Sequence, residues 1–131
     1  MIINSHTLDK LTEQAKTSPR LRVAFDLRNS EDDASQRMLN AIEPGTNIPI
    51  HCHRNTSETV ACLRGKAVEE FYDEHERRCV ATIELTPNGP NYVLNIPAGQ
   101  WHTIRSLESG TVIISAKDGK WEPLIDEDIL K

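Results

Sequence analysis

The sequence has no long apolar run. None of its segments approaches the roughly 18 consecutive apolar residues that a membrane-spanning helix needs. Its first thirty residues also lack the basic start, the apolar run and the small-residue cleavage site of a secretory signal. These absences predict a cytoplasmic protein with no membrane partner.

Cysteine is scarce, and the three cysteines do not form a recognisable pattern. Cys52, Cys62 and Cys79 are odd in number and show no C-x-x-C spacing. This argues against a disulfide framework and against a zinc–thiolate site. Free thiols fit a reducing compartment.

Positive charge is also in short supply. Fifteen Lys and Arg against 20 Asp and Glu give a formal net charge of −5. No global positive field therefore draws the protein to nucleic acid or to an anionic membrane surface. We expect a small-molecule ligand, and an anionic ligand would have to be captured by local groups.

The chain length fits one domain. A chain of 131 residues, of which 37% are hydrophobic, can build one core but not two. Leu8, Leu11 and Ala15 recur at helical spacing after the candidate cap Thr7, and Ser18-Pro19 supplies a stop signal. We expect a single domain over 1–131, with an N-terminal helical segment over 1–19, a β-barrel over 20–120 and a C-terminal tail over 121–131.

After Pro19 the hydrophobic period changes to two, which is typical of half-buried strands. Apolar and polar residues alternate over 21–27, 79–85, 92–96 and 112–116. Segment 37–42 contains good helix formers, but we assign it to a strand because its neighbours are strands. Many short strands separated by Gly and Pro turns predict an all-β sandwich or barrel. The tail over 121–131 is interpreted as a short helix or a strap over the barrel.

Four residues form a pattern that suits a divalent metal. His51 and His53 are one residue apart in a β-like segment, so both imidazoles share one face. Glu58 follows a turn-like stretch and begins an apolar run, and His102 stands just beyond the rigid turn 97–99. We expect all four side chains to converge. The other two histidines, His6 and His75, are interpreted as ordinary structural or surface residues.

The donor set limits the metal without selecting it. Neutral imidazole suits several transition metals, and an added carboxylate favours borderline or harder ions. One divalent ion, Fe, Mn, Ni or Zn, is therefore expected. Four protein ligands leave an octahedral ion two open positions, whereas a tetrahedral zinc is nearly closed.

Two segments carry a resemblance to a known superfamily. GTNIPIHCHRNTSETVACLRG, residues 45–65, fits the first cupin motif, G-x5-H-x-H-x4-E-x6-G, at every fixed position. PAGQWH, residues 97–102, fits the core of the second motif, P-x-G-x-x-H, although Asn91 and Ser106 replace its glycine and its terminal asparagine. The sequence therefore resembles the cupin superfamily.

A wider resemblance points to one family within it. The stretches RMLNAIEPGT, IPAGQWHTI and LESGTVIISAKDG are similar to the WbuC family of cupin-fold metalloproteins. The resemblance implies a cupin double-stranded β-helix, which is a jelly-roll barrel, with the metal in its mouth. It also implies the ligands His51, His53, Glu58 and His102, a homodimer and an association with bacterial surface-polysaccharide gene clusters. It implies no known reaction.

Several functions are compatible with such a centre, so whether the protein is an enzyme stays open. The first is a metal-dependent isomerase or epimerase that acts on a small sugar-related or carboxylate substrate. The alternatives are a non-haem Fe(II) dioxygenase, a non-catalytic ligand-binding module anchored by the metal, and a purely structural metal site.

No residue is assigned as the catalytic acid or base. Val60 and Cys62 share the face of Glu58, and Cys62 is interpreted as packing. Arg37, Glu70 and Tyr72 are the nearest candidates for proton transfer or anion binding, and Arg37 and Tyr72 are taken as pocket residues. Trp101 is expected to pack on the outer face, because neighbouring strand residues face opposite ways.

Overall fold

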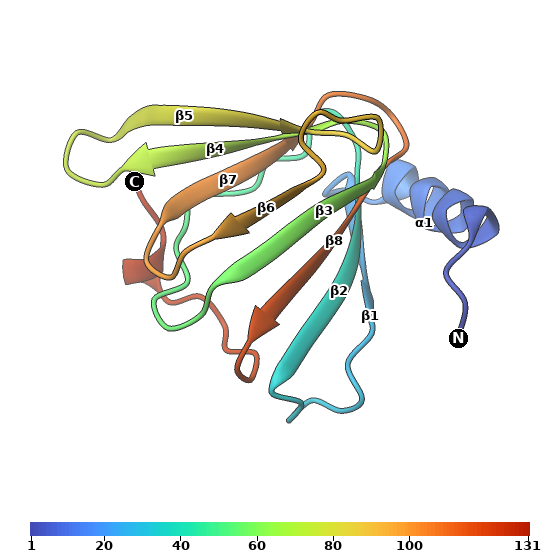
Figure 1. Ribbon diagram of the computed structural model, residues 1–131, viewed down its shortest axis with the longest axis horizontal. Helices are drawn as coiled ribbons and strands as arrows, with labels where there is room; N and C mark the ends of the chain where they lie inside the picture. Colours follow the sequence, from blue (N-terminus) through green and yellow to red (C-terminus); the bar gives the residue numbers. More distant parts are fainter.

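The computed structural model describes residues 1–131 as eight strands in two antiparallel sheets, with one helix against the outside of the larger sheet (Figure 1). The larger sheet has the strand order β1-β2-β8-β3-β6, and the smaller sheet has the order β5-β4-β7. The elements are α1 Ser5–Thr17, β1 Arg22–Asp26, β2 Ser35–Ile42, β3 Glu58–Arg64, β4 Ala67–Asp73, β5 Arg78–Leu85, β6 Val93–Ile96, β7 Trp101–Ser106, β8 Thr111–Asp118 and the 3-10 turn η1 Asp126–Asp128.

The core between the sheets follows from strand alternation. In β3, Glu58, Val60 and Cys62 are buried and face Lys117, Ser115 and Ile113 of β8, while Thr59 and Leu63 are exposed. The apolar members of this inner face meet those of the other sheet. The resulting core cluster contains Ile42, Val60, Cys62, Ala67, Leu85, Ile96, Ile104 and Ile113.

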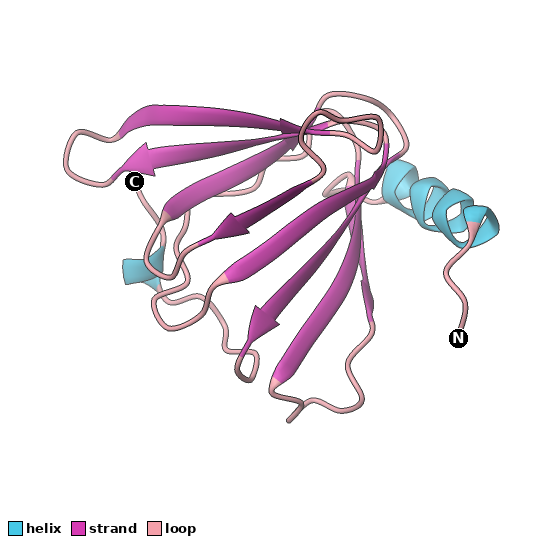
Figure 2. Ribbon diagram, in the orientation of Figure 1, coloured by secondary structure: helices cyan, strands magenta, loops and turns pink.

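The outer face of the larger sheet is covered by α1. Leu39 and Ala41 of β2 point outward and pack with Leu11 and Ala15 of the helix and with Val112. Figure 2 shows the helix beside the sheets rather than between them. Its N-terminal cap is Asn4, whose side chain accepts a hydrogen bond from the Thr7 backbone. The expectation that Thr7 is the cap is therefore wrong. The cap is Asn4, three residues earlier, and Thr7 completes the capping box with it.

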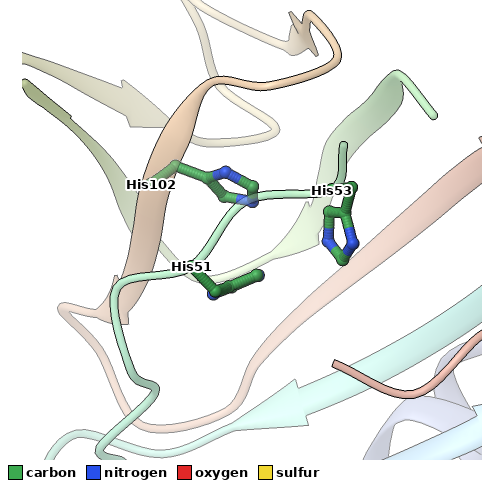
Figure 3. Close-up of side chains that lie close together, drawn as sticks. All are labelled: His51, His53 and His102. Carbon is green, nitrogen blue, oxygen red and sulfur yellow. The ribbon is translucent and has the colours of Figure 1, made fainter. Parts of the chain in front are cut away.

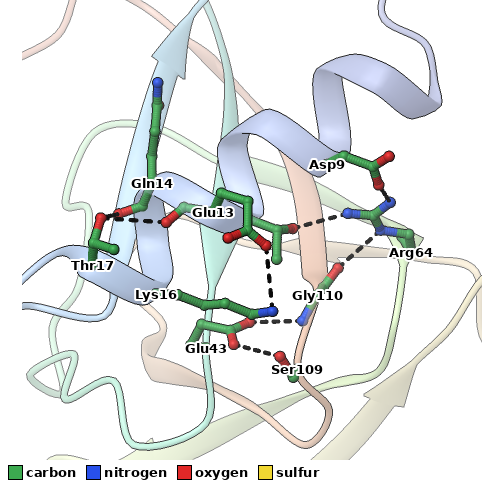
Figure 4. Close-up of polar contacts among 10 residues, drawn as sticks. Asp9, Glu13, Gln14, Lys16, Thr17, Glu43, Arg64, Ser109 and Gly110 are labelled. Carbon is green, nitrogen blue, oxygen red and sulfur yellow. Dashed lines mark hydrogen bonds and ion pairs between the residues drawn. The ribbon is translucent and has the colours of Figure 1, made fainter.

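A cluster of hydrogen bonds joins α1 to the barrel (Figure 4). The Arg64 guanidinium reaches Asp9, Thr12 and the carbonyl oxygen of Gly110, at 2.6, 2.9 and 3.1 Å. Glu43, which is 7% exposed, accepts hydrogen bonds from Ser109 and from the Gly110 backbone. These contacts join the helix to the loops at one end of the barrel, so we assign this junction a structural role.

The predicted all-β architecture with a short N-terminal helix is confirmed, and segment 37–42 lies in a strand. The expected strand over 92–96 begins later, because Tyr92 lies outside β6 with 55% of its surface exposed. The C-terminal tail adopts both expected forms: η1 is a short helical turn, and backbone hydrogen bonds join Asp128 to Cys52 and Leu130 to Ile50. None of the helices is long and apolar enough to span a membrane.

Candidate metal centre

His51 and His53 lie in the long loop between β2 and β3, which passes beside β7, the strand that contains His102. His51 and His102 exchange two backbone hydrogen bonds, of 3.0 and 2.8 Å, in an isolated antiparallel bridge. The first two histidines thus lie in a bridged loop rather than in a regular strand. Figure 3 shows the three rings gathered around one point. Their ligand nitrogens all lie within 4.8 Å of one another.

In two of the three rings, the Nδ1 atom is hydrogen-bonded to a backbone carbonyl group. The Nδ1 atom of His51 lies 2.7 Å from the carbonyl oxygen of Pro49, and that of His102 lies 2.8 Å from the carbonyl oxygen of Gln100. A carbonyl oxygen can only accept, so each Nδ1 donates and Nε2 is the nitrogen that can bind a metal.

Glu58, at the start of β3, brings a carboxylate from the opposite sheet. Its Oε1 atom lies 3.3 Å from His102 Nε2 and 3.9 Å from His53 Nε2. Its Oε2 atom lies 3.7 Å from the Lys117 ammonium. The structure therefore brings together all four residues that the sequence pattern singled out.

The protonation states in this cluster suit a metal ion. Burial lowers the pKa of His51 and that of His53 to about 4, which leaves both imidazoles neutral near pH 7. Burial raises the pKa of Glu58, but the hydrogen bond with His102 and the charge of Lys117 outweigh it and lower that pKa to about 2. Neutral imidazoles and an ionised carboxylate are the forms that bind metals.

His102 behaves differently from the other two histidines. Burial lowers its pKa, but hydrogen bonds to Glu58 and to the Gln100 carbonyl outweigh burial, and the net pKa is raised. The raised pKa means that His102 holds a proton more readily than the other two histidines. A metal that binds at Nε2 competes with this proton.

The cluster faces a cavity of about 650 Å³ between the sheets. This size is typical of small-molecule sites. Apolar side chains form much of the wall, and polar groups from both sheets interrupt it. The tail crosses the mouth, where Trp121, Leu124 and Ile125 border the cavity. Residues that point inward from the strands include Asn40, Ile42, Glu58, Val60, Glu69, Ile104, Ile113, Ser115 and Lys117.

Glu69 of β4 is a titratable cavity residue that no sequence pattern indicated. Its side chain lines the cavity, only 2% of the residue is exposed, and Oε2 has no hydrogen-bond partner. Burial raises the pKa of Glu69 to about 8, which keeps the carboxyl neutral near pH 7. In the register with β7, Glu69 lies opposite Ile104 and two residues from Phe71, which is opposite His102. Glu69 is therefore a diagonal neighbour of His102 on the inner face.

Of the two expected pocket residues, one borders the cavity and the other does not. Tyr72 is not among the residues that line the cavity, because its register opposite Trp101 places it on the outer face of β4 with Glu70. Arg37 borders the cavity, as expected. It lies opposite Ala116 in β2, and its guanidinium binds Asp33 at 2.9 Å. The position of Tyr72 follows from strand alternation.

Two further interpretations agree with the structure. Cys62 is buried in the core cluster, as expected for a packing residue. Trp101 is absent from the cavity lining and donates a hydrogen bond from Nε1 to Glu74, while the Arg54 guanidinium lies 5.7 Å from its ring centre. It therefore packs on the outer face.

Known proteins share this fold. The family model described as "Domain of unknown function (DUF6016)" matches residues 3–84, which is more than half of the chain. No curated protein matches the sequence. Among solved structures, the capsular polysaccharide assembling protein CapF from Staphylococcus aureus has a TM-score of 0.67 at 21% identity, over 82% of this chain and 30% of that one.

Two other solved structures are similar. An oxalate oxidase in complex with the substrate analogue glycolate has a TM-score of 0.66 at 12% identity, over 83% of this chain and 56% of that one. KdgF from Halomonas sp. has a TM-score of 0.61 at 14% identity, over 80% of this chain and 85% of that one. This chain thus spans less than two thirds of the CapF and oxalate oxidase chains. The likenesses confirm the cupin jelly-roll fold.

Proposed function

The chain belongs to the DUF6016 family, and we propose that it is a metal-dependent cupin whose divalent ion is held by His51, His53, Glu58 and His102. The observation that carries the proposal is the convergence of three imidazoles, with ligand nitrogens within 4.8 Å of one another, beside a buried carboxylate and an open cavity. Fe, Mn, Ni and Zn are the candidate ions.

The proposed activity is an isomerase or epimerase reaction on a small sugar-related or carboxylate substrate. An ion in this position would polarise a carbonyl or hydroxyl oxygen of the substrate. The cavity supports the proposal because its volume of about 650 Å³ admits a small molecule and its lining combines apolar and polar side chains. It also contains a carboxyl group, Glu69, in addition to the proposed ligands.

The finer assignment is to the WbuC family and to bacterial surface-polysaccharide metabolism. It rests on the sequence resemblance around the two motifs and is supported by the likeness to the capsular polysaccharide assembling protein CapF. We further propose one domain over 1–131, a homodimer and a cytoplasmic location. The three free cysteines support the location.

Solvent exchange tests the reaction class. The metal-loaded protein is incubated in D₂O with a panel of aldoses, ketoses and hydroxy acids, and carbon-bound deuterium is followed by NMR. Exchange that requires both the metal and His102 supports an isomerase or epimerase. Oxygen uptake by the Fe(II) form without such exchange would replace the proposal with a dioxygenase. Substrate binding with neither outcome would indicate a non-catalytic module.

A further inference from the structure

Glu69 is the one inward-facing side chain of the barrel that has a buried polar atom without a partner. The only other such atom in the protein is Nε of Arg37, which also borders the cavity but whose guanidinium is already paired with Asp33. Leaving a buried carboxyl oxygen unpaired costs free energy, so a native site of this kind needs a reason. Glu69 borders the cavity, and a bound molecule can supply the missing hydrogen bond.

The chemistry of the missing partner is restricted. Burial raises the pKa of Glu69 to about 8, so its carboxyl both donates and accepts near pH 7. A hydroxyl group also donates and accepts, so it can pair with Glu69 in either protonation state. A carboxylate or an ammonium group can pair with only one of the two states.

The charges around the centre favour an anionic ligand. Three of the four proposed ligands, His51, His53 and His102, are imidazoles, which carry no charge when they bind a metal. The negative charge of Glu58 is offset by Lys117, whose ammonium lies 3.7 Å away. The two positive charges of a divalent ion are therefore not balanced by the protein. Arg22, which faces inward opposite Ile42, adds a further cation to the lining.

We propose that the cavity binds a small hydroxy acid, with its carboxylate at the metal centre and a hydroxyl group hydrogen-bonded to Glu69. This inference rests on the proposed function, because it takes the metal as the carboxylate's partner. It adds the substrate class and assigns Glu69 as the residue that recognises the hydroxyl. Glu69 lies in β4 of the smaller sheet, and the proposed metal ligand Glu58 lies in β3 of the larger sheet. The bound hydroxy acid would therefore lie between the two sheets.

Glycolate and acetate form a matched pair of probes, because they differ by one hydroxyl group. Both are titrated by calorimetry into Mn(II)-loaded wild type, Glu69→Leu and Glu69→Gln, after the metal content of each protein has been measured. Mn(II) favours octahedral coordination, so four protein ligands leave positions open for the probe's carboxylate. We expect glycolate to bind wild type more tightly than acetate. Glu69→Leu should lower the affinity for glycolate several-fold, up to about tenfold, and leave the affinity for acetate unchanged. Glu69→Gln should keep most of the preference, because an amide also donates and accepts.

The outcomes separate this inference from the proposed function. Wild type that binds none of Fe(II), Mn(II), Ni(II) and Zn(II) would overturn both. Bound metal with no preference for glycolate, or an equal loss of both affinities in Glu69→Leu, would overturn only the hydroxy-acid assignment. Should Glu69→Leu fail to fold, a crystal structure of wild type with glycolate decides the matter. A water molecule on Glu69 Oε2, with the glycolate hydroxyl elsewhere, would also overturn the assignment.

Discussion

Burial gives the titratable side chains of the cavity different charges, although they lie close together. His51 and His53 lose their proton, Glu58 keeps its negative charge through His102 and Lys117, and Glu69 stays protonated. The deciding factor for each residue is whether a partner of opposite charge compensates desolvation. Glu58 has two such partners, whereas Glu69 faces mainly apolar neighbours.

The raised pKa of Glu69 predicts a pH effect on stability. The folded protein holds a proton on Glu69 up to about pH 8, whereas the unfolded chain releases it near pH 4.5. The contribution of this carboxyl is therefore largest at low pH and is lost as the pH rises from about 4.5 to about 8. In metal-free protein, wild type should lose stability relative to Glu69→Gln across this window, by on the order of a few kcal/mol.

Urea unfolding at pH 5, 6, 7 and 8, in the presence of a chelator, measures this difference. The comparison with Glu69→Gln removes the contributions of the histidines. The lowered pKa values of His51 and His53 act in the opposite direction to Glu69, and the raised pKa of His102 acts in the same direction. Parallel pH curves for the two proteins would show that Glu69 is ionised in the folded state and would contradict the account of its burial.

The sequence could predict the four proposed ligands but not Glu69. His51, His53 and Glu58 stand at fixed spacings in one motif, and His102 follows a recognisable turn. Strand β4 gives no such signal, because both of its faces contain apolar residues and one glutamate. Only the pairing with β5 and β7 shows that Glu69 points inward and that Glu70 points outward, where it binds Arg105.

At the scale of elements, the C-terminal strap is held close to the metal centre. Arg54, the residue after His53, bonds to Asp128 at 2.9 Å and to the Glu127 carbonyl oxygen at 2.8 Å. Ile129 also forms a bridge with His51. The sequence could predict a short helix or a strap at this position, but not its partners, because these contacts join residues more than 70 positions apart.

We predict that Arg54→Ala loosens the strap. The Arg54–Asp128 pair is largely exposed on the arginine side, so its loss should cost at most about 1 kcal/mol of stability. Hydrogen exchange in residues 120–130 should nevertheless speed up, and bound metal should leave faster in a chelator assay. Arg78→Ala, which breaks an exposed pair with Glu76 far from the strap in sequence, is the control. Equal behaviour of the two variants would show that the Arg54–Asp128 pair does not hold the C-terminal strap in place.

The turn between β3 and β4 offers a second test at this scale. Gly65 has a φ of +81°, and a Cβ atom there would lie 2.7 Å from the Cα atom of Thr111. Gly99 has a similar φ of +82° but open space around it. Gly65→Ala should therefore lower the free energy of unfolding by about 2 kcal/mol or more, and Gly99→Ala by about 1 kcal/mol. Denaturant titration measures both, and equal losses would show that the contact with Thr111 is relaxed without cost.

At the scale of the whole molecule, the packed cores of the barrel are separate from the proposed metal ligands. The inner core of eight buried residues and the outer cluster under α1 are built without the four proposed ligands. The all-β fold was predictable because strand periodicity and turn residues recur along the chain. The division into two sheets was not, because β3 pairs with β8 and β6, and only tertiary packing sets these partners.

Metal removal should therefore lower stability without unfolding the chain. Binding to the folded state stabilises it in proportion to the logarithm of the metal concentration over the Kd, which is about 2.7 kcal/mol at a hundredfold excess over the Kd. A chelator should lower Tm while the far-UV circular dichroism spectrum at 25 °C stays unchanged. Loss of the β spectrum on chelation would show that the metal is structural.

Elemental mass spectrometry of the protein purified without a histidine tag tests the central claim most directly. Wild type, His51→Ala and His102→Ala are compared after incubation with Fe(II), Mn(II), Ni(II) or Zn(II), with folding checked by circular dichroism. The account predicts about one metal ion per wild-type chain and its loss in both folded variants. Wild type without metal under all four conditions, or variants that keep it, would contradict the account.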